Sequence, residues 1–196
     1  MSNVNVAKHL IVSIGSELYL ALAKGPLTTA KALGLPFSGH ILIIPIAHTP
    51  IASPSERAEM EEYRQRLIKF FDTRNCNTVT FEIQQSEAIH AHWQVIPVPK
   101  SKSLEEEFIH GFEERNMKLE KRAPGELEEY CRVVLPTGTF VATLPAFFDL
   151  QLPRRILAKI LGLQDREDWR ACIQTEEEER EDATAFRAEF EAETSA

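Results

Sequence analysis

The sequence has 196 residues, of which 43% are hydrophobic and 27% charged, and its net charge is -8. This composition predicts a globular chain with a sizeable core and excludes disordered and fibrous classes. No apolar run approaches the roughly 20 residues that a bilayer-spanning helix needs, and the first residues lack a signal-peptide pattern, so we expect neither membrane insertion nor secretion.

The negative charge is concentrated at the end of the chain. From Asp165 onward there are 12 acidic residues against 4 basic ones, which leaves 18 of each in residues 1–164. An acidic tail argues against uniform electrostatic capture of nucleic acid, and deleting it from Thr175 is expected to raise non-specific RNA affinity. Short basic clusters can still touch phosphates locally or be solvated surface: Lys100 with Lys102, Lys118 with Lys121 and Arg122, and Arg154 with Arg155.

The three cysteines do not form a metal or disulfide framework. Cys76, Cys131 and Cys172 are far apart and odd in number, and none belongs to a Cys-x-x-Cys pair. We expect reduced thiols in an intracellular protein, with no catalytic role.

The first half of the chain predicts strands around one long helix. Residues 9–23 are apolar with a break at Gly15, as in a hairpin, and residues 41–44 form an apolar run typical of a strand covered on both faces. Prolines on either side of His48 place that histidine in the loop after this strand. A further strand is predicted over residues 78–83.

Two helices are predicted from capping-box patterns. Ser53 and Glu56 flank a proline at the start of a helix that extends to Phe71 with apolar residues on one face. Ser103 and Glu106 repeat the pattern before a second helix, whose predicted buried stripe is Leu104, Phe108 and Phe112.

Beyond Pro124 the pattern changes, and we place a boundary between two modules there, at residues 1–123 and 124–196. Residues 130–135 and 139–144 flank Pro-Thr-Gly and predict a hairpin. A helix is expected from Pro153 to a C-terminal cap at Gly162. A last helix is expected after Thr175, with its inward face formed by Ala183, Phe186 and Phe190.

The segment Ile89–Val98 carries the candidate chemistry. Its polar and apolar residues alternate, so a strand would project His90, His92 and Gln94 from one face, with Ala91, Trp93 and Val95 on the other. Imidazoles in such a row can donate to phosphate oxygens, and one of them can attack phosphorus. A metal site is the main chemical alternative, but the segment contains no acid and Gln is a poor zinc ligand. A solvated strand face with two alternating histidines is the structural alternative.

The segment Gly39-His40-Ile41-Leu42-Ile43-Ile44-Pro45-Ile46-Ala47-His48, followed by His90-Ala91-His92-Trp93-Gln94, resembles the two halves of the histidine-triad fold. Gln in the third position is similar to the galactose-1-phosphate uridylyltransferase branch of that fold. More closely, the chain resembles CwfJ C-terminal regions one and two, of the lariat-debranching-associated type. The matching stretches begin at Lys8, Leu20, Gln94, Arg154 and Asp168, and they extend over nearly the whole chain.

This resemblance implies an α+β fold: a histidine-triad-like antiparallel sheet with packed helices in residues 1–123, and a smaller C-terminal α+β module. It implies a nuclear accessory role in RNA processing, beside the lariat debranching enzyme and the late spliceosome, in turnover of excised intron lariats. RNA or a nucleotide is a further expected partner, and no cofactor or metal is expected. Members of the family usually carry additional N-terminal domains, including a metallophosphoesterase-like one.

Carried over by position, His92 is the candidate nucleophile, and His90 and Gln94 are its companions around the phosphate. His48 is expected at the pocket rim, while Lys24 and Lys100 are phosphate-facing candidates with surface solvation as the alternative. His40 and His9 are expected to be structural.

Three hypotheses follow from this assignment. The first is a binding module that recognises a phosphate, nucleotide or branched RNA end and assists the debranching enzyme. The second is an active nucleotide hydrolase or transferase that proceeds through His92, and the third is a purely structural interaction domain. A nucleotide-induced change in melting temperature and covalent attachment of a labelled nucleotide distinguish them.

Overall fold

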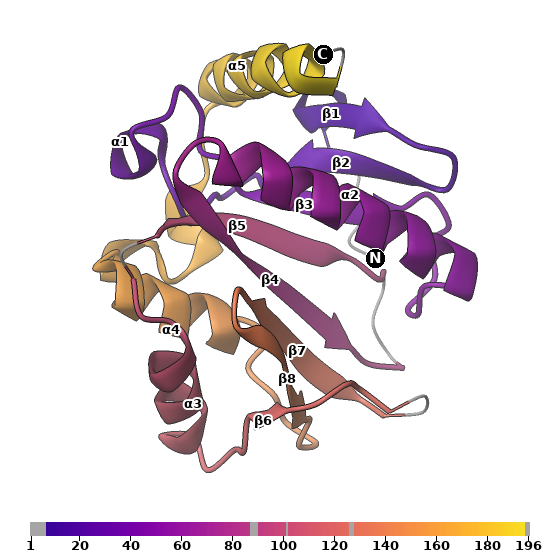
Figure 1. Ribbon diagram of the computed structural model, residues 1–196, viewed down its shortest axis with the longest axis vertical. Coiled ribbons are helices and arrows are strands. Elements are labelled where there is room, and N and C mark those ends of the chain that lie inside the picture. The colour runs from indigo at the N-terminus through magenta and orange to yellow at the C-terminus, as the bar shows by residue number, and fades with distance from the viewer. Residues whose placement is uncertain (1–6, 87–89, 101, 126–127, 195–196) are drawn as a thin grey trace.

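A computed structural model of the chain describes residues 7–86, 90–100, 102–125 and 128–194. Within these residues, eight strands form one antiparallel sheet in the order β1-β2-β3-β5-β4-β7-β8-β6 (Figure 1). The predicted α+β class and antiparallel sheet are confirmed. The strands are β1 (Ile11–Ile14), β2 (Leu18–Leu22), β3 (Ile41–Pro45), β4 (Cys76–Gln84), β5 (Trp93–Pro99), β6 (Glu120–Lys121), β7 (Tyr130–Leu135) and β8 (Gly138–Thr143).

Helices pack on the sheet and along one of its edges. Figure 1 shows α2 lying across the sheet, α5 beside the β1 edge, and α3 with α4 together near the other half. The α-helices of the described part are α1 (Ala30–Leu33), α2 (Pro54–Asp72), α3 (Glu105–Glu113), α4 (Leu152–Leu161) and α5 (Glu176–Thr194). Short 3-10 turns are η1 (Lys8–Leu10), η2 (Gln164–Arg166) and η3 (Trp169–Cys172).

The start of α2 follows its sequence signal. The Ser53 hydroxyl accepts from the backbone N–H of Glu56, and the Glu56 carboxylate accepts from the backbone N–H of Ser53, so the predicted capping box is present. A cap of this kind contributes about 1 kcal/mol to helix stability. Buried Met60, Leu67 and Phe70 lie on the face that packs on the sheet.

The predicted capping box of α3 is wrong. The helix begins at Glu105 after Leu104, which makes no side-chain cap bond, so Ser103 lies one residue too early to cap it. Leu104 is buried in the same cluster as Phe108 and Phe112, and its burial accounts for this start better than the cap pattern does. The predicted stripe of the helix is therefore confirmed although its cap is not.

Two hydrophobic clusters lie on opposite faces of the sheet. Along β5, Trp93 and Val95 belong to the cluster under α2 and α5, whereas Ile96 and Val98 belong to the cluster under α3 and α4. This alternation is the period of two expected for a strand buried on both faces. The Gln94 side chain therefore lies on the α3 and α4 side of the sheet.

The C-terminal segments are joined to the N-terminal ones in two places. Strand β7 pairs with β4, so the hairpin of β7 and β8 extends the same sheet. Helix α5 returns to the N-terminal half, where Phe186 contacts Phe37 and Phe70 at ring centroid distances of 5.1 and 5.3 Å. The division at residue 123 stays a prediction about sequence modules, and in three dimensions it falls between strands of one sheet.

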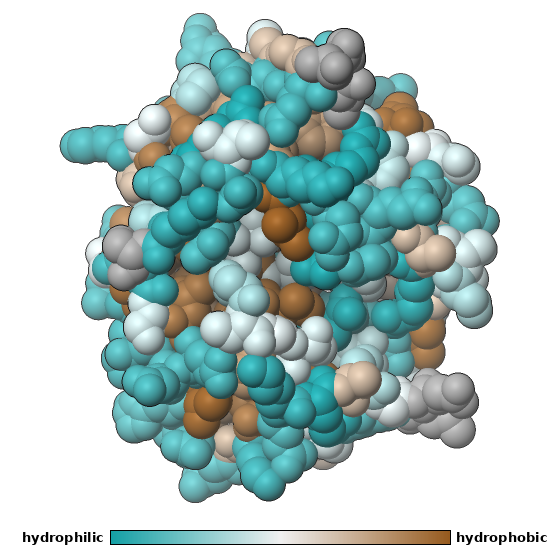
Figure 2. Space-filling view, in the orientation of Figure 1, coloured by the Kyte–Doolittle hydropathy of each residue, from teal (hydrophilic) through white to brown (hydrophobic). Residues whose placement is uncertain are grey.

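The remaining sequence expectations concern the surface and the cysteines. None of the described helices is long and apolar enough to cross a bilayer. On the face drawn in Figure 2, hydrophilic residues (teal) dominate and hydrophobic ones (brown) show as scattered small areas. The three cysteines are buried free thiols, as predicted.

Candidate functional site

The candidate site lies where the chain enters β5. His90, Ala91 and His92 are not part of the regular strand, which begins at Trp93, and Ile89 lies outside the described residues. The backbone N–H of Ala91 donates to the carbonyl of Thr49 at 2.8 Å, which fixes the segment beside the loop after β3. The observed strand therefore begins later than predicted, at Trp93. The apolar half of the predicted alternation is confirmed, because Ala91, Trp93 and Val95 pack in one cluster, and within the strand Gln94 faces the other way.

His90 and His48 come together at the β3 end of this segment. Their ring centroids are 4.6 Å apart, and His90 Nε2 donates to the carbonyl of Pro45 at 2.8 Å. His90 is 9% exposed, whereas His48 is exposed on the loop. The His90 ring is thus engaged by the protein, and its backbone carbonyl is the group that contacts His92.

That carbonyl determines which nitrogen of His92 is free. His92 Nδ1 donates to the carbonyl of His90 at 3.3 Å, so the lone pair of the neutral ring resides on Nε2. Desolvation of the ring lowers the pKa of His92, although the hydrogen bond to His90 opposes the shift. The residue as a whole remains exposed. At neutral pH, His92 therefore offers an unprotonated Nε2, which is the state that a nucleophile or proton acceptor requires.

Gln94 is oriented by His40. The backbone N–H of Leu27 donates to His40 Nδ1 at 3.1 Å, so the ring proton is on Nε2, which donates to Gln94 Oε1 at 3.2 Å. Because its oxygen is occupied by His40, Gln94 has its NH₂ group available as a donor. Burial lowers the pKa of His40 to about 3, with a further contribution from the positive charge of Arg154, so His40 stays neutral. His40 is structural, as predicted, but it acts directly on a candidate site residue.

The opposite face of β5 is supported by a buried ion-pair network. The guanidinium of Arg132 lies 4.3 Å from the centroid of the Trp93 ring and 2.8 Å from the Glu82 carboxylate. Arg57 of α2 contacts the other carboxylate oxygen at 2.8 Å. Glu82 is 5% exposed, so removing either arginine would leave a buried charge without part of its compensation. The network holds the first residue of β5 immediately after His92.

The two candidate lysines both lie toward the end of β5 that is farther from His92. Lys24 is exposed in the loop after β2, next to the residues that contact His40. Lys100 follows β5 at its far end, roughly 26 Å along the chain from His92 at the rise of an extended strand, and it pairs with Asp72 at 2.5 Å. Lys24 therefore adjoins the His40 part of the site, and the strand register places neither lysine next to His90 and His92. Near Lys100, an open groove of about 410 Å³ is lined by Arg64, Asp72, Asn77 and Thr139.

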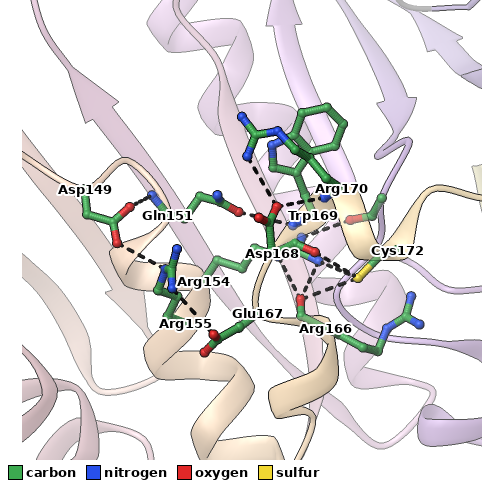
Figure 3. A network of polar contacts seen from close by, with 11 residues as sticks. Asp149, Gln151, Arg154, Arg155, Arg166, Glu167, Asp168, Trp169, Arg170 and Cys172 are labelled. Atoms are coloured by element: carbon green, nitrogen blue, oxygen red, sulfur yellow. Dashed lines mark hydrogen bonds and ion pairs between the residues drawn. The ribbon is translucent and has the colours of Figure 1, made fainter.

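Sequence reasoning missed a set of arginines that support the site from the C-terminal segments. Arg154 was expected on the surface with Arg155, but it is 6% exposed and donates to the carbonyls of Gly25 and Arg166 at 2.9 and 2.8 Å. Figure 3 shows Arg154 among the polar contacts that join α4 to residues 166–172. Leu157 and Ala158, three and four residues later and therefore on the same face of the predicted helix, are the signal that could have placed Arg154 inward.

His92 and Gln94 offer complementary hydrogen-bonding groups. His92 Nε2 can accept a hydrogen bond or attack an electrophile, and the Gln94 NH₂ group can donate a hydrogen bond. Together the two groups suit a ligand that has several acceptor oxygens and one donor proton. Among the described residues, no group of three or more His, Cys, Asp or Glu side chains is placed to hold a metal ion.

Two family models match the chain. They are described as protein similar to CwfJ C-terminal, matching residues 1–110, and protein similar to CwfJ C-terminus 2, matching residues 88–192. Similar proteins include CWF19-like protein mug161 of Schizosaccharomyces pombe, which is 43% identical over 97% of this chain. CWF19-like protein DRN1 of Saccharomyces cerevisiae is 35% identical over 96% of the chain, and CWF19-like protein 1 of Homo sapiens is 34% identical over 97%. The chain spans only 36%, 44% and 37% of the lengths of these relatives.

Proposed function

The chain belongs to the CwfJ C-terminal family, and on that premise we propose that it is an accessory module of RNA processing with a phosphate-binding site at His92 and Gln94. The ligand is a phosphate, a nucleotide or a branched RNA end. The module assists the lariat debranching enzyme in intron turnover after splicing, in the nucleus and near the late spliceosome. A histidine-triad-like arrangement of the site is part of the same proposal.

The observation that carries this proposal is the paired orientation of two side chains. The His90 carbonyl holds His92 with Nε2 free, and His40 holds Gln94 with its NH₂ group free. Neither orientation is required to fill the core, because His92 is exposed and Gln94 only partly buried. An acceptor and a donor that are fixed in advance lose little entropy on binding a ligand, which favours recognition.

The charge of the chain supports recruitment by a protein rather than by bulk RNA. Residues 1–164 are neutral and the remainder carries a net charge of -8, so non-specific attraction to the RNA backbone is weak. Several basic residues that the sequence suggested for phosphate contact are also paired with acids, including Lys118 with Glu120 and Arg122 with Glu128. The debranching enzyme is therefore the proposed source of recruitment, and the site acts on an RNA end already held nearby.

Two measurements test this function. Isothermal titration with AMP should show binding to the wild-type chain and its loss in His92→Ala combined with Gln94→Leu. A pull-down with purified debranching enzyme should retain the chain in both forms, because the altered side chains belong to the ligand site. If the wild type does not bind AMP, the proposed ligand site is contradicted. If the debranching enzyme does not retain the chain, the proposed partner is contradicted.

A second candidate function is nucleotide hydrolysis or transfer through His92. The free Nε2 and the lowered pKa of His92 favour it, because the ring is unprotonated at neutral pH. In this reaction the Nε2 lone pair forms a P–N bond to the α-phosphorus of a nucleotide while the P–O bond to the leaving group breaks. Water then attacks phosphorus, the P–N bond breaks, and the nucleotide is released.

The enzyme hypothesis has its own readout. Incubation of the wild type with ATP labelled at the α-phosphorus should give an acid-labile, base-stable labelled protein if a nucleotidyl-histidine forms. His92→Ala should give none. If the wild type binds AMP but neither becomes labelled by ATP nor hydrolyses it, the result supports the accessory function and contradicts the enzymatic one.

A further inference from the structure

A buried cation lies close to the candidate site without a carboxylate as its hydrogen-bond partner. The hydrogen bonds of the Arg154 guanidinium go to the carbonyls of Gly25 and Arg166 and to Cys172 Sγ, at 2.8 to 3.3 Å. Burying a guanidinium is costly unless its donors are satisfied, and here neutral acceptors satisfy them. An apolar residue would fill the same space at lower cost. The position of Arg154 therefore calls for an explanation beyond packing.

A second arginine from the same region holds the adjoining backbone. Arg166 Nε donates to the carbonyl of Leu27 at 2.9 Å, and its Nη2 donates to the carbonyl of Pro26 at 2.7 Å. Together with the Arg154 bond to Gly25, three consecutive carbonyls of one loop accept hydrogen bonds from two arginines. We call residues 25–27 the clamped loop.

The backbone of η3 contacts the clamped loop from another side. A Cβ atom at Gly25 would lie 2.2 Å from the carbonyl oxygen of Trp169, so only glycine permits this approach. Figure 3 shows Trp169 and Arg170 in the same network of polar contacts as Arg154 and Arg166. The clamped loop is thus fixed by contacts from residues more than 120 positions away in the sequence.

The clamped loop leads directly to the candidate site. Its last residue, Leu27, donates its N–H to His40 Nδ1, and this bond sets the tautomer with which His40 holds Gln94 Oε1. A displaced Leu27 would allow His40 to place its proton on Nδ1, and Nε2 would then no longer donate to Gln94. The Gln94 carboxamide could rotate and present oxygen instead of NH₂ toward the ligand.

We propose that Arg154 and Arg166 are positioning residues for the candidate site, which act through the clamped loop and His40 to keep the Gln94 NH₂ group directed at the ligand. The C-terminal segments thereby control the chemistry of a site formed by the N-terminal strands. The role of Gln94 toward a phosphate rests on the proposed function. The effect of the two arginines on the His40 tautomer and on the Gln94 orientation does not rest on the proposed function.

The test uses the full chain and four variants, two of them at Arg166. Arg166→Ala removes two hydrogen bonds to the clamped loop from a half-buried residue, and Gly25→Ala displaces the loop from Trp169 without removing a charge. Arg170→Ala is the matched control, because it removes an exposed arginine of the same segment that bonds to Asp168 and not to the clamped loop. Circular dichroism and thermal unfolding establish which variants are folded.

The decisive readout is the tautomer of His40, measured by ¹⁵N NMR of the imidazole nitrogens, together with the side-chain NH₂ signals of Gln94. The wild type and Arg170→Ala should show the Nε2–H tautomer and one set of Gln94 signals. Arg166→Ala and Gly25→Ala should show averaged His40 shifts and moved or broadened Gln94 signals. Arg166→Lys, which can reach one carbonyl, should give an intermediate result.

The outcomes separate the two proposals. In Arg166→Ala and Gly25→Ala, AMP affinity should also fall about tenfold, the scale of one directed hydrogen bond, with no change in Arg170→Ala. If the wild type binds no AMP, the proposed function fails and the NMR comparison alone decides the positioning role. Folded Arg166→Ala or folded Gly25→Ala with wild-type His40 and Gln94 signals overturns the inference. If Arg166→Ala does not fold, Gly25→Ala decides.

Discussion

His40 Nε2 donates to Gln94 Oε1 at 3.2 Å, although the two residues are 54 positions apart in the sequence. His40 lies immediately before β3 and Gln94 lies in β5, its antiparallel neighbour. The pairing gives a buried histidine a defined tautomer and a candidate ligand-binding amide a defined direction. It is the contact through which the fold influences the candidate site.

Neutral His40 should make stability depend on pH. Its pKa is about 3 in the folded chain against about 6.5 when unfolded, so between these values the unfolded chain binds a proton that the folded chain does not. The free energy of unfolding should therefore fall as the pH is lowered through this window. Between pH 7.5 and 4.5 the wild type should lose roughly 2 to 3 kcal/mol more than His40→Gln, as measured by urea unfolding.

The comparison with His40→Gln isolates this contribution, because the glutamine can also accept from Leu27 and donate to Gln94. Burial of part of Asp182 raises its pKa, which acts in the opposite direction, but this effect is common to both proteins and cancels in the difference. Parallel pH profiles for the two proteins would show that His40 protonates freely in the folded chain.

Helix α5 should be required for folding. Phe186 is fully buried against Phe37 and Phe70, and Phe186→Ala should lower the free energy of unfolding by about 3 to 5 kcal/mol. Phe147, which is 97% exposed, provides the control, and Phe147→Ala should change the free energy of unfolding by less than about 0.5 kcal/mol. Equal effects in urea unfolding would mean that α5 does not close the N-terminal core.

The placement of α5 changes how the acidic tail can be tested. Deletion from Thr175 would remove Ala183, Phe186 and Phe190 from the core together with the charges, so its effect on RNA binding cannot be assigned to charge. The sequence predicted the inward face of this helix correctly. It could not show that the partner of that face is the N-terminal half, because helical periodicity gives the buried side of a helix but not what covers it.

The same distinction explains which parts of the site were predictable. The alternation of polar and apolar residues correctly predicted that Gln94 and Trp93 lie on opposite faces of the strand. Local motifs correctly predicted the start of α2 and the C-terminal cap of α4 at Gly162. The inward position of Arg154 depends on the carbonyls of Gly25 and Arg166, which only the folded chain brings to it. Lys100 was a phosphate-facing candidate, but the length of β5 separates it from the histidines.

Charge substitutions on α5 should raise RNA affinity without disturbing the core. Glu177 and Glu181 are exposed, and replacing both with Gln removes two negative charges, whereas replacing both with Asp keeps them. In filter binding with single-stranded RNA at about 50 and about 200 mM salt, the wild type should bind weakly and lose affinity with salt. The Gln variant should bind more tightly than the Asp variant at low salt. Tight, salt-insensitive binding by the wild type would contradict the charge argument.

His92→Ala should separate function from stability. Because the residue is exposed, its removal should change the free energy of unfolding by less than about 1 kcal/mol, and it should abolish any nucleotide binding or labelling. His110→Ala is the control, since His110 is an exposed histidine of α3. It should leave both properties unchanged. A large loss of stability in His92→Ala would show that the ring is part of the packing.

The most direct measurement for the candidate site is an NMR titration of the full chain with AMP at about pH 7.5 and again near pH 6, following the histidine imidazoles and the side-chain amides. We expect AMP to shift the signals of His92 and Gln94 at both pH values, because these two side chains offer the preset acceptor and donor. A titration that leaves His92 and Gln94 unchanged, or that shifts only residues around Lys100, would contradict the account.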